Sequence, residues 1–172
     1  GLVAPESDDN PWHYKISWNP MNVVKAGQQG AQFYQDGKAK VVPYQQLFKR
    51  TTPITIPEYG TLDGYFNRNA LAYAHRYGIP EAETVIRGTL RQPGFCSSWN
   101  LLVQTGLTDH NNKLDLRGLR LCDFTEIFLP ESTEQQQSLS DRWAGLLNIS
   151  PEHEDFQRLD WLCPTSTEPV TL

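Results

Sequence analysis

Positive charge is scarce in this sequence. Among its 172 residues, 15 Lys and Arg stand against 20 Asp and Glu, which gives a net charge of -5. The basic residues are scattered, and the longest basic run is the pair Lys49 and Arg50. Proteins that bind nucleic acid usually carry a basic excess on one face. The composition therefore predicts no nucleic-acid partner.

Long apolar runs and a cysteine framework are also missing. No apolar stretch approaches the roughly 18 residues that a membrane span needs, and no basic segment followed by an apolar one opens the chain. The cysteines Cys96, Cys122 and Cys163 are odd in number and widely spaced, which is a poor disulfide framework. We expect core thiols in a cytoplasmic protein that has no membrane partner.

The sequence also lacks the motifs of several kinds of site. It contains neither GxGxxG nor GxxxxGK[ST], so we expect no cofactor-binding residue for a dinucleotide in this chain. The histidines lie far apart, which predicts no metal site. Ser97 and Ser98 have no GxSxG context, and Cys96 lies on an apolar helical stripe. Hydrolase chemistry is not supported, and no catalytic residue can be named.

The hydrophobic content of 38% is enough for a core, and the first half of the chain alternates short elements. Asn19 as an N-cap and Pro20 in the first turn predict a helix that runs to about Tyr34. A second helix is expected over residues 70–77, capped by Asn69 and closed by Gly78. Alternating residues predict strands at 13–18, 38–42, 54–56 and 84–91, which we expect to form one sheet.

Apolar residues recur at helical spacing in the second half of the chain. The stripes are Phe95, Trp99 and Leu102; Leu121, Phe124 and Phe128; Leu139, Trp143, Leu146 and Leu147; and Phe156, Leu159 and Cys163. The whole pattern predicts one α+β domain over residues 1–172. It would have a mixed sheet, helices largely on one face and a helical C-terminal half.

Arginines and a helix start form the candidate binding site. The helix that begins at Pro20 offers backbone N–H groups at its positive end, while Arg68, Arg87 and Arg91 offer forked donors that match carboxylates. Arg87 and Arg91 would share one face of the predicted strand. This pattern favours an anionic small-molecule substrate. Alternatively, the arginines pair with acids such as Glu81, Glu83 or Asp63 and brace the edge of the sheet.

Two segments carry motifs of a known enzyme family. GLVAPESDDNPWHYKISWNPMNVV at residues 1–24 is similar to the loop that enters the substrate domain of glutamate-forming saccharopine dehydrogenases. GYFNRNALAYAHRYGIPEAETVIRGTLRQPGFCSSWNLLVQTGLTD at residues 64–109 resembles the family's GYPNRDS, YGIPEA and IRGTLRYPGF motifs, in the same order. The resemblance covers residues 1–109, and the helical part from Asn111 onward fits it only loosely.

The resemblance implies an oxidoreductase that uses NAD or NADP. Such enzymes oxidise the carbon–nitrogen bond of saccharopine and release glutamate and aminoadipate semialdehyde, a reaction of lysine metabolism. This chain would be the substrate-binding and dimerisation domain of a homodimer. The nucleotide would be bound mainly by a domain outside it, so the chain alone would be inactive.

The resemblance also implies which residues of this chain contact the substrate. The family's substrate-contacting tripeptide after SW falls on Asn19, Pro20 and Met21, and many relatives have Arg where Met21 stands. Met21 cannot hold a carboxylate, and we hypothesise that Lys25, one helical turn further on, replaces that contact. Arg68 is kept in the NRN motif, and Arg87 and Arg91 are kept in RGTLR. For each arginine, bracing of the fold remains an alternative to substrate contact.

Two other functions remain open. Met21 is compatible with a related reductase that acts on another carboxylated secondary amine, as carboxyspermidine-type enzymes do. A chain that kept the dimer-forming sheet and lost catalysis would be a structural or regulatory module.

Overall fold

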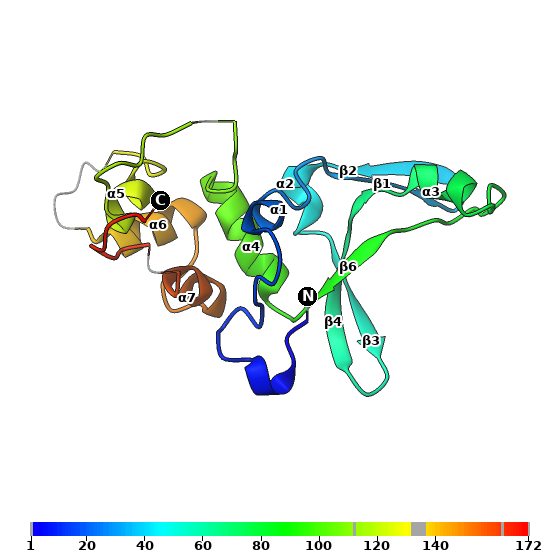
Figure 1. Ribbon diagram of the computed structural model, residues 1–172, viewed down its shortest axis with the longest axis horizontal. Helices are drawn as coiled ribbons and strands as arrows, with labels where there is room; N and C mark the ends of the chain where they lie inside the picture. Colours follow the sequence, from blue (N-terminus) through cyan, green and yellow to red (C-terminus); the bar gives the residue numbers. More distant parts are fainter. Residues whose placement is uncertain (1, 112, 132–136, 163, 172) are drawn as a thin grey trace. The chain divides into compact units, whose positions relative to one another are not determined.

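The computed structural model describes residues 2–111, 113–131, 137–162 and 164–171 (Figure 1). The chain divides into two compact units, Gly1–Cys96 and Ser97–Leu172. The first unit contains η1 (Pro5–Ser7), α1 (Pro20–Val24), β1 (Ala31–Gln35), β2 (Lys38–Val42), α2 (Tyr44–Leu47), β3 (Thr51–Ile56), β4 (Gly60–Phe66), β5 (Arg68–Asn69), α3 (Leu71–Arg76) and β6 (Gly88–Arg91). Helix α4 (Phe95–Thr105) leads into the second unit, which contains α5 (Leu121–Glu126), α6 (Leu139–Leu147) and α7 (Glu154–Asp160). The fold is therefore mixed α and β.

The strands form two three-stranded sheets, and the expectation of one sheet is wrong. One sheet has the order β2-β1-β5, with β1 antiparallel to β2 and parallel to β5. The other has the order β3-β4-β6 and is antiparallel throughout. Figure 1 shows the β1–β2 hairpin and the β3–β4 hairpin extending in different directions.

The chain passes from one sheet to the other at two places. The chain leaves β4 at Phe66 and enters β5 at Arg68, whose φ of 59° bends the backbone out of the strand direction. The second crossing is at residues 85–88. Val85 forms an isolated bridge with Tyr34 of β1, in the β2-β1-β5 sheet, and the chain pairs with β4 from Gly88 onward. The predicted strand over residues 84–91 is thus regular only over Gly88–Arg91.

The long helix predicted over residues 20–34 is also wrong. Helix α1 has five residues and ends at Val24. Gly27 and Gly30 then adopt φ values of 83° and 68°, and β1 follows at Ala31. A Cβ on Gly30 would lie 2.5 Å from the carbonyl oxygen of Val42. The glycines therefore end the helix and allow the chain to turn, because L side chains rarely adopt these φ values.

Other expectations have mixed outcomes. The strand over residues 13–18 is absent, since that segment forms only a bridge between Leu2 and Tyr14, and His13 has a φ of 48°. The strand over residues 38–42 and the helix over 70–77 are confirmed by β2 and α3. The side chain of Asn69 accepts a hydrogen bond from the N–H of Leu71 at 2.9 Å, as a cap of that helix would.

The core of the first unit is built from both sheets and α2. The rings of Phe33 on β1 and Phe66 on β4 stack with centroids 4.1 Å apart. Leu47 on α2 and Leu62 on β4 are almost fully buried, at 0% and 1% exposed. The ring of Phe48, next to Leu47, packs 5.0 Å from that of Tyr65. Apolar burial of this kind supplies most of the drive for folding.

In the second unit, the predicted helices form and pack through two polar contacts as well as apolar ones. Trp143 is 1% exposed, and its indole N–H donates to the Thr105 hydroxyl at 2.7 Å. Asp155 on α7 accepts hydrogen bonds from Ser97 at 2.8 Å, Ser98 at 3.0 Å and Arg158 at 2.9 Å, all at Oδ1. These bonds tie the start of α4 to α7. The stripe position Cys163 lies outside the described residues.

We expect Asp155→Asn to lower the free energy of unfolding by about 2 kcal/mol, because the carboxylate is 16% exposed and its charge strengthens three hydrogen bonds. Urea unfolding followed by tryptophan fluorescence measures this change. The control is Asp115→Asn, which removes a pair with Arg117 in which both side chains are at least 62% exposed. That change should leave the free energy of unfolding almost unchanged, because water solvates both charges, and equal effects of the two variants would contradict the prediction.

Candidate functional site

Arg91, the last residue of β6, lies among aromatic rings. It is directly opposite Asp63 of β4 in the strand register. Its guanidinium carbon is 5.0 Å from the ring centroid of Tyr14, 5.1 Å from that of Phe95 and 5.9 Å from that of Tyr65. Cations at such distances are attracted by the negative faces of the rings. We call Arg91 with these three rings the Arg91 cluster.

The Arg91 cluster holds two buried polar atoms without a hydrogen-bond partner in the described part of the chain. They are Nε of Arg91 and the hydroxyl oxygen of Tyr14. Nη1 of Arg91 donates to its neighbour's carbonyl oxygen, that of Leu90, at 3.1 Å. Buried polar groups are nearly always satisfied in proteins, so unsatisfied ones mark a candidate ligand site. Each of the two groups carries a hydrogen that a carboxylate could accept.

Burial controls the ionisation of the groups beside Arg91. It raises the pKa of the Tyr65 hydroxyl above its ordinary value, and the nearby charge of Arg91 opposes this. Burial also raises the pKa of the Cys96 thiol from 9.0 to about 12, with a smaller contribution from the charge of Asp63. Cys96 is 1% exposed and stays protonated at neutral pH. It is a core thiol, as expected, whereas Cys122 is only half-buried.

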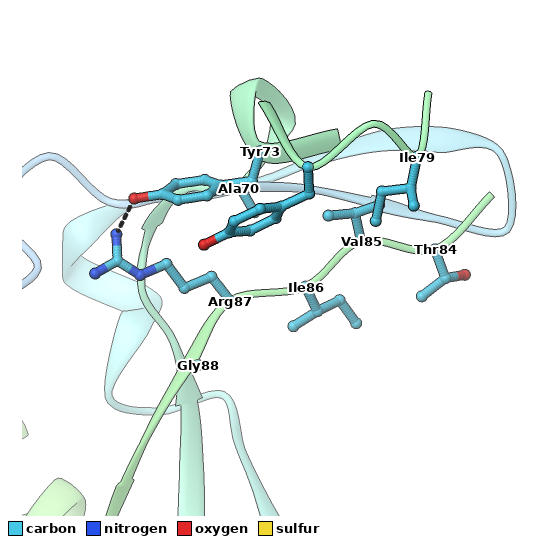
Figure 2. Close-up of a pocket in the computed structure, with 9 residues that line it drawn as sticks. Ala70, Tyr73, Ile79, Thr84, Val85, Ile86, Arg87 and Gly88 are labelled. Atoms are coloured by element: carbon cyan, nitrogen blue, oxygen red, sulfur yellow. Dashed lines mark hydrogen bonds between the residues drawn. The ribbon is translucent and has the colours of Figure 1, made fainter. Parts of the chain in front are cut away.

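Arg87 has a different environment, below helix α3. Its Nη1 donates to the Tyr73 hydroxyl at 3.0 Å, and its guanidinium carbon is 5.3 Å from the centroid of the same ring. Figure 2 shows this hydrogen bond and places Arg87 on the segment that runs below α3. Arg87 also lines a hollow of about 600 Å³ there.

Arg68 is exposed, and β5 holds its backbone beside Ala31 of β1. The N–H of Asn67 donates to the carbonyl oxygen of Arg87 at 2.8 Å, so the structure brings the segments of Arg68 and Arg87 together. Across the described residues, none of the three arginines forms an ion pair with a carboxylate. The alternative in which they pair with Glu81, Glu83 or Asp63 is therefore wrong.

The residues at α1 form a separate group. Asn19 caps the helix by accepting from the N–H of Met21 at 2.9 Å, and Pro20 occupies its first turn, as predicted. Met21 is 52% exposed, and Lys25 is the exposed C-cap residue. Within the described chain, no hydrogen bond, ion pair or ring contact joins the side chains of Met21 or Lys25 to the arginines.

Sequence reasoning missed the aromatic partners of the arginines. The sequence predicts a strand at Tyr14, and no motif marks Tyr65 or Tyr73 as part of a site. The available signal was the absence of acids next to Arg91 in the sequence, together with the many aromatic residues, 11% of the chain. Which ring meets which arginine depends on strand pairing between distant segments, such as β4 with β6.

Comparisons with known proteins identify the family. The model of the saccharopine dehydrogenase C-terminal domain matches residues 1–169. The chain belongs to this family. The match extends the resemblance, expected for residues 1–109, to residue 169.

Individual relatives agree with this family assignment. The chain is 32% identical to a saccharopine dehydrogenase (NADP+, L-glutamate-forming) of Pyricularia oryzae, over 99% of this chain and 43% of that protein. It is 40% identical to the mitochondrial alpha-aminoadipic semialdehyde synthase of Mus musculus, over 99% of this chain and 19% of that protein. The chain thus spans less than half the length of these relatives.

A solved structure also matches. It is apo saccharopine dehydrogenase (L-Glu forming) from Saccharomyces cerevisiae, at a TM-score of 0.78 and 32% identity, over 99% of this chain and 39% of that one. The structural match therefore covers both units of the chain. Among the described residues, no group of acidic, histidine or cysteine side chains could hold a metal ion, and no helix is long and apolar enough to cross a membrane.

We expect the stability of the fold to fall as the pH rises from about 9 to about 12. The fold raises the pKa of Cys96 to about 12, so its stabilising effect is complete below the ordinary pKa of 9.0 and is lost as the folded thiol ionises. Unfolding in urea at a series of pH values measures this. In Cys96→Ala the decline should be shallower, because only Tyr65 and other groups remain to titrate. Identical pH profiles for the two proteins would contradict the prediction.

Proposed function

We propose that this chain is the substrate-binding and dimerisation domain of an NADP-dependent saccharopine dehydrogenase. The whole protein would oxidise saccharopine to glutamate and aminoadipate semialdehyde, in lysine metabolism. Family membership supports the reaction class, and the names of the fungal relatives support NADP rather than NAD. The homodimer, the single functional domain over residues 1–172 and the cytoplasmic location stay predictions.

The observation that carries the proposal is the Arg91 cluster. Saccharopine is a tricarboxylate, and a guanidinium that lies against rings rather than acids keeps its donors available for a carboxylate. Nε of Arg91 and the Tyr14 hydroxyl would each donate one hydrogen bond to it. Arg68 and Arg87 are proposed to add positive charge from the neighbouring segments.

The chain's own residues do not fit a dinucleotide. A dinucleotide domain has a parallel sheet with crossover helices and a glycine-rich turn at a helix start. The sheets described here are small, the β3-β4-β6 sheet is antiparallel, and the step from β5 to α3 contains Ala70 and no glycine. The proposal therefore assigns NADP to another part of the whole protein, and no residue of this chain to the hydride transfer.

In the whole protein, we expect Arg91→Lys to raise the KM for saccharopine at least about tenfold, because a lysine ammonium cannot offer the forked donors that match a carboxylate. Initial rates of NADP reduction measure this. The control is Arg50→Lys, at an exposed arginine whose side chain bonds to Gln46, and its KM should be unchanged. An unchanged KM in Arg91→Lys would argue against the Arg91 cluster as the substrate site.

The same assay separates the alternative functions. Turnover of another carboxylated secondary amine, with none of saccharopine, would favour the carboxyspermidine-type reductase. The absence of any turnover in a well-folded whole protein would favour the non-catalytic module. Saccharopine-dependent reduction of NADP would support the proposed reaction.

A separate proposal concerns Lys25. Met21 and Lys25 are one helical turn apart, and the N–H of Lys25 donates to the carbonyl oxygen of Met21 at 2.9 Å. Their side chains therefore leave the same face of α1. We propose that Lys25 contacts the carboxylate that Arg holds in relatives with Arg in place of Met21.

If Lys25 has this role, Lys25→Ala should weaken saccharopine binding about threefold to tenfold, and Met21→Arg should restore it in the double variant. Calorimetric titration of saccharopine into the whole protein measures both. Unchanged affinity in Lys25→Ala and in Met21→Arg alone would show that α1 does not bind the substrate.

A further inference from the structure

The hollow below α3 is a second site with ligand-binding features. It lies between α3 and residues 84–88 and has a volume of about 600 Å³. Tyr73, Tyr77, Ile79 and Val85 supply most of its apolar lining, and Arg87 supplies its charge. Small-molecule sites usually have volumes of about 300–1,000 Å³, with apolar walls and few polar groups. The hollow has both properties.

The charge of Arg87 and the aliphatic side chains of Ile79 and Val85 lie at opposite ends of the hollow. In Figure 2, Arg87 extends toward the hydroxyl of Tyr73 at one end, while Ile79 and Val85 approach each other toward the other end. Ile79 is 40% exposed, so this end opens to solvent. Exposed apolar surface beside a hollow commonly marks a binding site.

The guanidinium of Arg87 is fixed in place but not neutralised. Tyr73 holds it by one hydrogen bond and by its ring face, at 3.0 Å and 5.3 Å. Glu81 and Glu83 lie on the same loop, yet neither forms an ion pair with Arg87 within the described residues. A phenol takes only one N–H group of the fork, so the other N–H groups remain available for an anion.

This hollow is distinct from the Arg91 cluster. Arg87 and Arg91 share no ring or hydrogen-bond partner among the described residues. Their backbones are four residues apart, which is about 13 Å in an extended chain. One small ligand held in the hollow would therefore leave Arg91 free.

We propose that the hollow binds a small-molecule monocarboxylate with an apolar body. The carboxylate would accept hydrogen bonds from Arg87, and the body would lie against Tyr73, Tyr77, Ile79 and Val85. Saccharopine does not match this site, because its three carboxylates and two amines would leave charges unpaired against apolar walls. The inference therefore goes beyond the proposed function and is tested without it.

The test is a titration of the whole protein with phenylacetate, followed by NMR of the backbone amides of this chain's residues. Phenylacetate combines one carboxylate with one ring, and phenylacetamide is the matched uncharged probe. We expect saturable shifts at residues 70–88 with phenylacetate and at least about tenfold weaker binding of phenylacetamide. Equal affinities for the two probes, no saturable binding, or shifts centred on Arg91 would overturn the proposal.

Two pairs of variants locate the site. Arg87→Gln should reduce phenylacetate affinity at least about tenfold. Arg76→Gln is its control, because the guanidinium carbon of Arg76 is also near the Tyr73 ring, at 5.6 Å, but Arg76 is exposed and does not line the hollow. Equal losses in both variants would contradict a specific role for Arg87.

The second pair keeps the test decisive if Arg87→Gln does not fold. Ile79→Glu places a negative charge in the hollow at an exposed position, so it should abolish phenylacetate binding without loss of the fold. Ile16→Glu makes the same change at a residue that is 52% exposed and lies outside the hollow. If Ile79→Glu binds phenylacetate as tightly as Ile16→Glu does, the proposed site is wrong.

Discussion

The first unit depends on one bend in the backbone, where the chain passes from β4 to β5. Arg68 holds a φ of 59°, a conformation that costs a residue with a side chain about 1–2 kcal/mol. Strand pairing on both sides holds it in place, with β4 in one sheet and β5 in the other. The bond from Asn67 to Arg87 then fixes the second crossing segment beside the first. Because of this bend, two sheets share one core and the three arginines come from neighbouring segments.

A second regularity is that Arg87 and Arg91 lie against aromatic rings rather than acids. Arg87 lies over Tyr73, and Arg91 lies among Tyr14, Tyr65 and Phe95. A ring face attracts the cation but does not occupy the N–H groups at its edge in the way a carboxylate does. Both guanidinium groups are thus held in position with donors to spare. Such preorganisation lowers the entropy that binding an anion would cost.

The regular elements of the second unit are helices, which depend on local sequence patterns more than strands do. Its helices were predictable because each has an apolar stripe at helical spacing, and Ser138 also marks the start of α6 as an N-cap. The contacts between the helices were not predictable in the same way. Ser97 and Ser98 carry no motif, and only the packing of α4 against α7 brings them to Asp155.

The sequence by itself determined the family, most helices, strands such as β2, and the arginines as the candidate anion-binding residues. These depend on motifs and on periodicity within short segments. The division into two sheets, the end of α1 and the rings around Arg91 were decided by the tertiary structure. Nothing in the local pattern before Tyr34 marks Gly27 and Gly30 as the end of the helix, yet their positive φ values allow the turn into β1. The tertiary structure also separates the surroundings of Arg87 from those of Arg91. The partners of each come from distant segments, and local sequence patterns carry no information about which distant segments will pair.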